Sequence, residues 1–446
     1  MVSTGARSRR FVSHIAKKVS TVIFVPIYCV DKSKGASNER SIASRVNEAV
    51  GLALSIGLNV VHCEVVNITT KNPATLFGSG KVDAFKQVLS CSEGRDVSVA
   101  IVDCTLTPVQ QRNLEKLWSC KVIDRTALIL EIFGDRAQTR EGVLQVELAH
   151  LSYQKGRLVR SWTHLERQRG GSGFLGGPGE TQIESDRRLL QDKITRIRRE
   201  LKTVVKTRAL HRAKRKKMQH LVVALVGYTN AGKSTLFNQL SGANVLTEDM
   251  LFATLDPTLR KVTLPHGKTI LLSDTVGFIS NLPTHLVAAF RATLEEVVEA
   301  DFIIHVKDIS DPDHHAHARD VLEILSDLGV DVDNTNRIIE VWNKIDMLDE
   351  YTLNSLQISA RALFNPALMV SAKAGEGLKE LLSTIERRIF GEMQAVELVL
   401  KPETMSLIDW FYKNSGKVEQ WSHDDGSVTV RAVLTDEAKR QLDCIK

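Results

Sequence analysis

The feature that most constrains this chain is residues 227–234, which read GYTNAGKS and have the GxxxxGK[ST] spacing of a phosphate-binding loop. The apolar residues 221–226 before the loop predict a strand and residues 234–240 after it predict a helix, the context that the motif requires. Backbone N–H groups of such a loop surround a β-phosphate at the start of a helix. We expect Lys233 to bridge the β- and γ-phosphates and the Ser234 hydroxyl to bind Mg²⁺.

A second motif, DTVG at 274–277, follows the apolar strand predicted at 269–272. It places the Asp274 carboxylate near the metal, with contact through water left open, and lets the Gly277 N–H meet the γ-phosphate. Phe278 comes next, where Ras-type GTPases carry the glutamine that positions the attacking water. A phenyl ring cannot orient water, so we predict slow intrinsic hydrolysis that needs a partner or an ion. Anchoring of this segment in the core is the other role open to Phe278.

Base recognition is predicted from two further motifs, each after an apolar strand. In NKID at 343–346, the Asp346 carboxylate can accept both the N1–H and the N2–H of guanine. Adenine lacks these paired donors, so Asp346 can impose a large preference for guanine. The SAK stretch at 371–373 suits contact with the guanine carbonyl and packing on the base.

A threonine between the phosphate loop and residues 274–277 is needed to complete a nucleotide-dependent switch. Within 251–258 we choose Thr254 over Thr258 as the residue that reaches Mg²⁺ and the γ-phosphate only while the segment is ordered. Five motifs in this order indicate a GTPase domain. Asn230 also matches the asparagine of potassium-activated GTPases, so K⁺ is a candidate activator.

The predicted GTP site gathers these motifs. The candidate catalytic residues are Lys233, Thr254 and Gly277. The candidate Mg²⁺ ligands are Ser234, Thr254 and Asp274, with contact of Asp274 through water left open. The nucleotide-binding residues are predicted to be Gly227, Tyr228, Thr229, Asn230, Ala231, Gly232, Lys233, Ser234, Thr235, Phe252, Ala253, Thr254, Asp274, Thr275, Val276, Gly277, Asn343, Lys344, Asp346, Ser371, Ala372 and Lys373.

The rest of the chain predicts an α/β multidomain protein. Short β-branched runs alternate with amphipathic stretches in 1–137, which predicts a parallel α/β domain. Residues 138–217 predict an antiparallel helical hairpin around a glycine-rich loop, with one seam of Leu144, Leu148 and Leu151 facing a second of Leu190, Ile194, Ile197, Leu201 and Val204. Residues 218–392 form the Ras-like P-loop GTPase domain, and 393–446 read β-α-β-β-α, a small C-terminal α+β domain.

The second hairpin helix carries the charge surplus of the chain, whose 59 lysines and arginines exceed 53 acidic residues. Between 187 and 217 the only acids are Asp192 and Glu200, too few to neutralise the cations by pairing along the helix. A polyanion partner is therefore favoured over a merely solvated face. The residues predicted to face RNA are Arg196, Arg199, Lys214, Arg215, Lys216 and Lys217.

Composition excludes several other classes. The 6 cysteines form no CxxC pair, which argues against a disulfide framework or a structural zinc site. No apolar run approaches the roughly 18–20 residues that cross a bilayer, so a soluble protein is expected. The basic first twenty residues favour a frayed tail over an organellar presequence.

From about Asn72 to Gly391 the chain resembles the HflX family of translation-associated GTPases. The resemblance extends beyond the GTPase motifs to segments in family order at 73–81, 106–115, 122–126, 145–149, 177–188 and 274–278. Two stretches differ from the family pattern. Residues 155–158 replace a proline-arginine-leucine segment, which leaves the end of the first hairpin helix open, and Lys307 occupies a strand position that is usually apolar.

The resemblance implies a GTP hydrolase that binds the large (50S) ribosomal subunit when GTP-loaded and splits or rescues stalled ribosomes under stress. The alternative is an RNA-binding assembly or remodelling factor of the large subunit, gated by GTP and without splitting activity. A monomer in the bacterial cytoplasm is expected, with a mitochondrial location as the lesser alternative and peripheral contact with membranes left open. Some family members hydrolyse ATP through the N-terminal region, but we interpret residues 78–81 as a tight loop before a helix.

Overall fold

Two compact units make up the part of the chain that the structure describes. The structure is a computed structural model, and it describes residues 19–28, 40–91, 97–168, 182–217, 221–243, 250–280, 294–363, 365–424 and 426–445. The first unit contains the described residues up to Thr207 together with residues 250–255, and the second contains the remainder. The glycine-rich hairpin loop and the basic first residues lie outside the described residues.

The first unit is built on a four-stranded parallel sheet in the order β2-β1-β3-β4. Its strands are β1 (Ser20–Tyr28), β2 (Asn59–Ile68), β3 (Val99–Val102) and β4 (Lys121–Asp124). The helices between and after them are α1 (Ile42–Ser55), α2 (Ser79–Cys91), α3 (Pro108–Trp118) and α4 (Arg125–Arg136). This arrangement confirms the parallel α/β prediction.

Local sequence explains why these elements begin where they do. Thr107 and Gln110 form a capping box at the start of α3, where the threonine side chain accepts from the Gln110 N–H and Pro108 occupies the first helical turn. Asp124 caps α4 by accepting from the Ala127 N–H at 2.8 Å. Rings of Phe24, Phe77, Phe85 and Trp118 fill one side of the sheet core.

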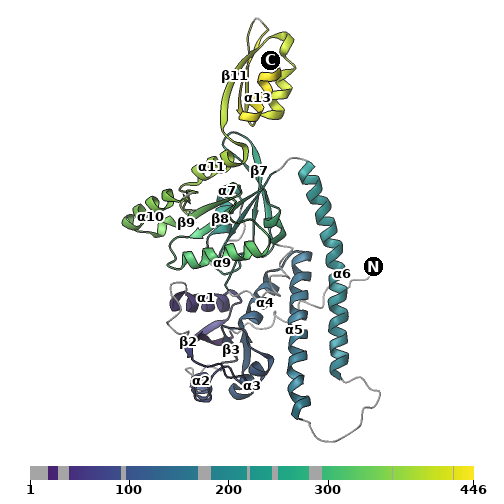
Figure 1. The fold of residues 1–446 in the computed structure, drawn as a ribbon, viewed down its shortest axis with the longest axis vertical. Helices are drawn as coiled ribbons and strands as arrows, with labels where there is room; N and C mark the ends of the chain where they lie inside the picture. Colours follow the sequence, from purple (N-terminus) through teal and green to yellow (C-terminus); the bar gives the residue numbers. More distant parts are fainter. Residues whose placement is uncertain are drawn as a thin grey trace. The chain divides into compact units, whose positions relative to one another are not determined.

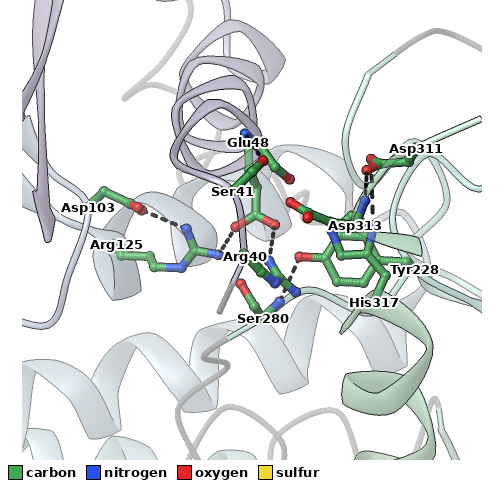
Figure 2. Close-up of polar contacts among 11 residues, drawn as sticks. Arg40, Ser41, Glu48, Asp103, Arg125, Tyr228, Ser280, Asp311, Asp313 and His317 are labelled. Atoms are coloured by element: carbon green, nitrogen blue, oxygen red, sulfur yellow. Dashed lines mark hydrogen bonds and ion pairs between the residues drawn. The ribbon is translucent and has the colours of Figure 1, made fainter. Parts of the chain in front are cut away.

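A buried ion network lies at the carboxyl ends of the parallel strands. The Arg125 guanidinium donates to Asp103 Oδ1 at 2.6 Å and pairs with Glu48 of α1, and Glu48 also pairs with Arg40 (Figure 2). Burial raises the pKa of Asp103, although Arg125 opposes that effect. The network joins α1, the residue that follows β3, and α4.

The helices α5 (Arg140–Gln168) and α6 (Gln182–Lys217) run side by side as a hairpin (Figure 1). They pack along the predicted seam. Its apolar cluster contains Leu144, Leu148, Leu151, Leu190, Ile194, Ile197, Leu201 and Val204, which confirms the seam residue by residue. α5 continues through 155–158 to Gln168, so the departure from the family pattern there does not end the helix. Arg157 instead reaches Asp124 Oδ2 at 2.6 Å and ties α5 to the end of β4.

The second unit contains a six-stranded sheet in the order β10-β9-β8-β5-β7-β6, in which only β6 is antiparallel to its neighbour. The strands are β5 (Val222–Gly227), β6 (Thr258–Thr263), β7 (Thr269–Asp274), β8 (Phe302–Asp308), β9 (Ile338–Asn343) and β10 (Leu368–Met369). The helices are α7 (Lys233–Ser241), α9 (His314–Asp327), α10 (Glu350–Ala362) and α11 (Leu378–Phe390), with a 3-10 turn η1 at Ile345–Met347. On β8, Lys307 is accommodated by an ion pair of 2.7 Å with Glu340.

A small antiparallel sheet of order β11-β13-β12 ends the second unit. The elements run β11 (Met393–Leu400), η2 (Pro402–Thr404), α12 (Leu407–Asn414), β12 (Val418–Ser422), β13 (Val428–Thr435) and α13 (Asp436–Ile445). This order confirms the predicted β-α-β-β-α reading, and one sheet face packs on α12 and α13. The search of the described helices for a membrane-crossing segment found none.

Candidate nucleotide-binding site

The phosphate loop joins the end of β5 to the start of α7, as predicted. Gly232 immediately before α7 has φ +86°, and a Cβ there would collide with Asn343 Nδ2. Asn230 also adopts a left-handed backbone, with φ +60°. A Cβ at Gly227 would strike the Val306 carbonyl of β8. The two glycines are therefore required by close approach of backbone and side chains, which a larger residue would block.

Lys233 lies inside the curve of this loop. Lys233 is 6% exposed, and its ammonium donates to the carbonyl oxygens of Gly227 at 3.1 Å and Tyr228 at 2.8 Å. Burial lowers the pKa of Lys233 to about 8, and the nearby Asp274 carboxylate opposes the shift in part. If a phosphate group replaced these carbonyl oxygens as the acceptor, it would contact a desolvated ammonium, and such a cation interacts strongly with anions.

The Ser234 and Asp274 oxygens meet beside the lysine. Ser234 Oγ donates to Asp274 Oδ2 at 2.7 Å, and the Asp274 side chain is fully buried. Thr275 Oγ1 donates to the Leu225 carbonyl at 2.6 Å and fixes the main chain that follows the aspartate. A hydroxyl and a carboxylate are hard oxygen donors of the kind that Mg²⁺ prefers, so this pair fits the metal that the sequence predicts.

Gly277 lies against the phosphate loop. A Cβ at this position would come within 2.9 Å of Thr229 Cγ2 and 3.2 Å of Lys233 Nζ. The next residue, Phe278, is 4% exposed, which confirms that its ring anchors the segment in the core. The structure thus brings the predicted residues Lys233, Ser234, Asp274 and Gly277 together at the carboxyl ends of β5 and β7.

The predicted base-recognition residues also converge. Asn343 is buried, donates to the Ala231 carbonyl at 2.9 Å and accepts from the Ala372 N–H at 2.9 Å, so it links the phosphate loop to the loop after β10. Ser371 Oγ donates to Asp346 Oδ1 at 2.6 Å. The Asp346 side chain remains exposed and able to accept from a base.

Sequence reasoning missed the partner of Lys344. Its ammonium forms an ion pair of 2.6 Å with Asp308 Oδ2, at the end of β8, and Asp308 Oδ1 also accepts from the Ser310 N–H and hydroxyl. Asp308 lies two residues after the apolar run 302–306, and this position is a signal that could have identified it. Lys373 is exposed and Thr235 is half-buried.

Residues 250–255, which include the predicted Phe252, Ala253 and Thr254, group with the first unit. Phe252 is 2% exposed with φ +58°, and its ring centroid lies 4.7 Å from that of Phe133 in an edge-to-face arrangement. Arg136 donates to Met250 Sδ at 3.2 Å. The roles of Phe252, Ala253 and Thr254 toward the nucleotide stay predictions.

Most basic side chains of α6 face solvent over the part that the structure describes. Arg196 is exposed and pairs with Glu200 at 3.2 Å, and Arg140 approaches the same glutamate at 4.0 Å. Arg208 forms an ion pair of 2.8 Å with Glu296. The other exposed cations of this helix include Lys193, Arg198, Arg199, Lys202 and Lys206. Lys214, Arg215, Lys216 and Lys217 belong to the helix, but their side chains lie outside the described residues.

Comparison with known proteins decides the family. The chain is 49% identical over 380 residues to the GTPase HflX of Magnetococcus marinus, which covers 85% of this chain and 86% of that protein. The chain belongs to the HflX family of GTPases. Its identity to the GTPase HflX of Escherichia coli is 41% over 387 residues, or 86% of this chain and 88% of that protein. The predicted resemblance is confirmed.

Family models cover each region of this HflX-family chain. Residues 43–134 match a GTP-binding GTPase N-terminal region, 136–215 a GTP-binding GTPase middle region, 222–344 a 50S ribosome-binding GTPase and 357–444 an HflX C-terminal domain. A solved GTP-binding protein from Sulfolobus solfataricus in complex with GDP is 22% identical, with a TM-score of 0.43, covering 83% of this chain and 98% of that one. Membership of the HflX family and the match of residues 222–344 to a GTPase family model identify the protein as a GTP-binding GTP hydrolase. The domain boundaries stay predictions.

Proposed function

We propose that this HflX-family GTPase docks on the large ribosomal subunit when GTP-loaded and splits or rescues stalled ribosomes under stress. The observation that carries the proposal is the exposed basic face of α6, in a chain whose GTPase region matches a 50S ribosome-binding GTPase. Guanidinium and ammonium groups on an exposed helix bind phosphate backbones and release counterions. The protein acts as a monomer in the cytoplasm.

Length and spacing support α6 as the RNA-binding element. The helix runs for 36 residues, about 54 Å at 1.5 Å per residue, so it can follow ribosomal RNA over several phosphates. Its apolar seam is used by α5, so the cations occupy the remaining faces. Arg196 and Arg199 lie in the described part, and Lys214–Lys217 extend the same charge at the helix end.

GTP hydrolysis in this site follows from the residues that converge there. Lys233 neutralises charge on the β- and γ-phosphates, the Gly277 N–H donates to the γ-phosphate, and Asp346 accepts from guanine. Ser234 and Asp274 would hold Mg²⁺, with Thr254 as a further ligand, and the bound ion offsets phosphate charge. Because Phe278 is buried and cannot orient water, the intrinsic rate is slow and ribosomal contacts accelerate it.

A monovalent cation is a second activator in this proposal. The Asn230 side chain is exposed at the tip of the phosphate loop, where its amide oxygen is available to a cation. K⁺ held there would supply positive charge that an arginine supplies in other GTPases. Hydrolysis should be faster in KCl than in NaCl, and Asn230→Ala should remove that difference. Equal rates of the unchanged protein in both salts would reject K⁺ activation.

The test of the proposed function is steady-state GTP hydrolysis with and without purified large subunits, in potassium buffer. A large stimulation is expected, and the same preparation should then separate 70S particles into subunits in a sucrose gradient. Stimulation without separation would favour the assembly or remodelling factor. Confirmed GTP binding with no stimulation would reject the ribosome as the activator.

A further inference from the structure

The segment that follows Gly277 is hydrogen-bonded to the phosphate loop as a short parallel bridge. The Phe278 N–H donates to the Gly227 carbonyl at 3.1 Å, and the Thr229 N–H donates to the Phe278 carbonyl at 2.7 Å. These bonds lie on either side of Tyr228. The position of Gly277 is therefore linked to the conformation of the loop that binds phosphate.

The Tyr228 side chain adds a third bond to this bridge. Its hydroxyl accepts from the Ser280 N–H at 3.1 Å, and both residues are 8% exposed (Figure 2). A buried main-chain N–H needs an acceptor, because its desolvation is otherwise uncompensated. The phenol thus holds the chain two residues beyond Phe278, at the far end of the segment.

The ring of Tyr228 is itself held by α9. It stacks on the His317 imidazole with centroids 4.0 Å apart and an interplanar angle of 10°. His317 is 8% exposed and lies 3.8 Å from Asp311 Oδ2, while Asp311 Oδ1 accepts from the Asp313 N–H at 2.8 Å at the start of the helix (Figure 2). The tyrosine therefore cannot rotate away without breaking contacts to both α9 and Ser280.

We propose that Tyr228 is a positioning residue for GTP hydrolysis, which holds residues 278–280 on the phosphate loop and so keeps the Gly277 N–H aligned with the γ-phosphate. The inference rests on the donor role proposed for Gly277. Gly277 has little room, since Thr229 and Lys233 line the space where its side chain would be. Because Phe278 stands in place of the water-positioning glutamine, the hydrolysis rate depends more strongly on the alignment of the Gly277 N–H.

Tyr228→Phe is the decisive variant, because it keeps the ring and the stack on His317 and removes the hydroxyl that accepts from the Ser280 N–H. We expect kcat for GTP to fall about tenfold or more and the affinity for GTP relative to GDP to fall several-fold, with GDP affinity unchanged. Tyr351→Phe is the matched control, since Tyr351 is 86% exposed on α10 in the same unit. It should leave all three quantities unchanged.

Two further variants separate positioning from loss of structure. His317→Ala removes the stack and should give the same selective loss for GTP, while His317→Phe should restore it by replacing one aromatic ring with another. Equal losses of GTP and GDP affinity in Tyr228→Phe, or an unchanged kcat, would overturn the proposal.

Measuring without ribosomes keeps this inference separate from the ribosomal proposal, because every readout is intrinsic to the protein. Gly277→Ala tests the premise, since its methyl group would contact Thr229 and Lys233 and should weaken GTP more than GDP. If Gly277→Ala left the GTP-to-GDP affinity ratio unchanged, the donor role of Gly277 would be wrong and the positioning role of Tyr228 would fall with it.

Discussion

Residues 250–255 and residues 274–280 are both predicted to respond to the γ-phosphate, but they are held in different ways. Residues 274–280 are fixed by main-chain hydrogen bonds to the phosphate loop and by the Tyr228 hydroxyl. Residues 250–255 are fixed by side-chain packing in the first unit, chiefly the edge-to-face contact of Phe252 with Phe133. One segment is positioned by its own domain and the other by the N-terminal domain.

Because of this difference, the two predicted γ-phosphate contacts should depend on different units of the protein. The alignment of Gly277 should survive changes to the first unit, because its contacts with Thr229 and Lys233 lie in the second. The conformation of Thr254 should depend on how well α4 is packed. Phe252 has a left-handed backbone that is unfavourable for a bulky residue, so its conformation persists only while the surrounding contacts hold it.

The largest effect should come from a residue that belongs to neither segment. Asp346→Asn should lower the affinity for GTP roughly a thousandfold and shift preference toward xanthine, whose carbonyl accepts where guanine donates. The ratio of GTP to GDP affinity should not change, because the contacts predicted for Asp346 are to the base and not to the phosphates. Competition binding with GTP, GDP, XTP and XDP measures both quantities.

Asp349→Asn is the matched control for that substitution. Asp349 lies three residues after Asp346 and caps α10 by accepting from the Thr352 N–H at 2.8 Å. Asparagine is an equally good cap. Base preference should be unchanged in this variant. Retained guanine preference in Asp346→Asn would remove Asp346 from the recognition site.

Truncating Phe133 should affect residues 250–255 and leave residues 274–280 in place. Phe133→Ala should destabilise the first unit by about 3 kcal/mol and release residues 250–255, because the ring that fixes Phe252 is lost. Hydrogen exchange should rise at 250–255 and stay unchanged at 274–280. Denaturant unfolding followed with exchange mass spectrometry measures both effects.

Phe85→Ala controls for general loss of stability, since Phe85 is also buried but packs on Phe24, Phe77 and Trp118. It should destabilise the first unit to a similar extent without selective exposure of 250–255. Equal exchange of this segment in both variants would mean that Phe133 does not hold it in particular.

Features that depend on residue spacing or on position after a strand could be predicted from the sequence. The hairpin seam was predicted by spacing alone, because apolar residues three and four apart must share one helix face, and the structure packs those positions together. The convergence of Lys233, Asp274 and Asn343 was predicted because each follows a strand of one parallel sheet.

Contacts that depend on sheet order could not be predicted in the same way. Tyr228 and Ser280 are 52 residues apart, and α9 reaches Tyr228 only because β8 pairs with β5, where Gly227 lies opposite Val306. The packing of Phe252 on Phe133 likewise joins two different domains of the sequence. No periodicity or motif specifies which strand lies beside which, so these partners became visible only in three dimensions.

Raising the pH should lower the affinity for GDP and for GTP to the same extent. Such an equal loss would be due to Lys233, because changes at residues 250–255 or 274–280 should affect GTP alone. Burial lowers the pKa of Lys233 to about 8, and bound phosphate favours the protonated form. Below that pH the lysine is already charged and affinity is flat, whereas above it binding must take up a proton, so affinity falls by up to about tenfold per pH unit. Nucleotide titrations between about pH 7 and about pH 9 measure this slope.

Lys233→Arg supplies the control, because arginine stays protonated throughout this range. Whatever its absolute affinity, this variant should show no loss with rising pH. A slope that persisted in Lys233→Arg would assign the titration to another group.

The smallest effect should come from single charges on α6, which lie outside both segments and the GTP site. Lys202→Gln should weaken binding to large subunits a few-fold and lower the slope of log affinity against log salt by about one if the ammonium contacts a phosphate. Lys116→Gln is the matched control, an exposed lysine on α3 of the same unit that is not part of the basic helix. GTP and GDP affinity should be unaffected in both. Only direct contacts depend on which lysine is removed. An unchanged salt slope in Lys202→Gln, or the same decrease in Lys116→Gln, would therefore show that the electrostatic field of the whole protein drives binding, rather than the face of α6.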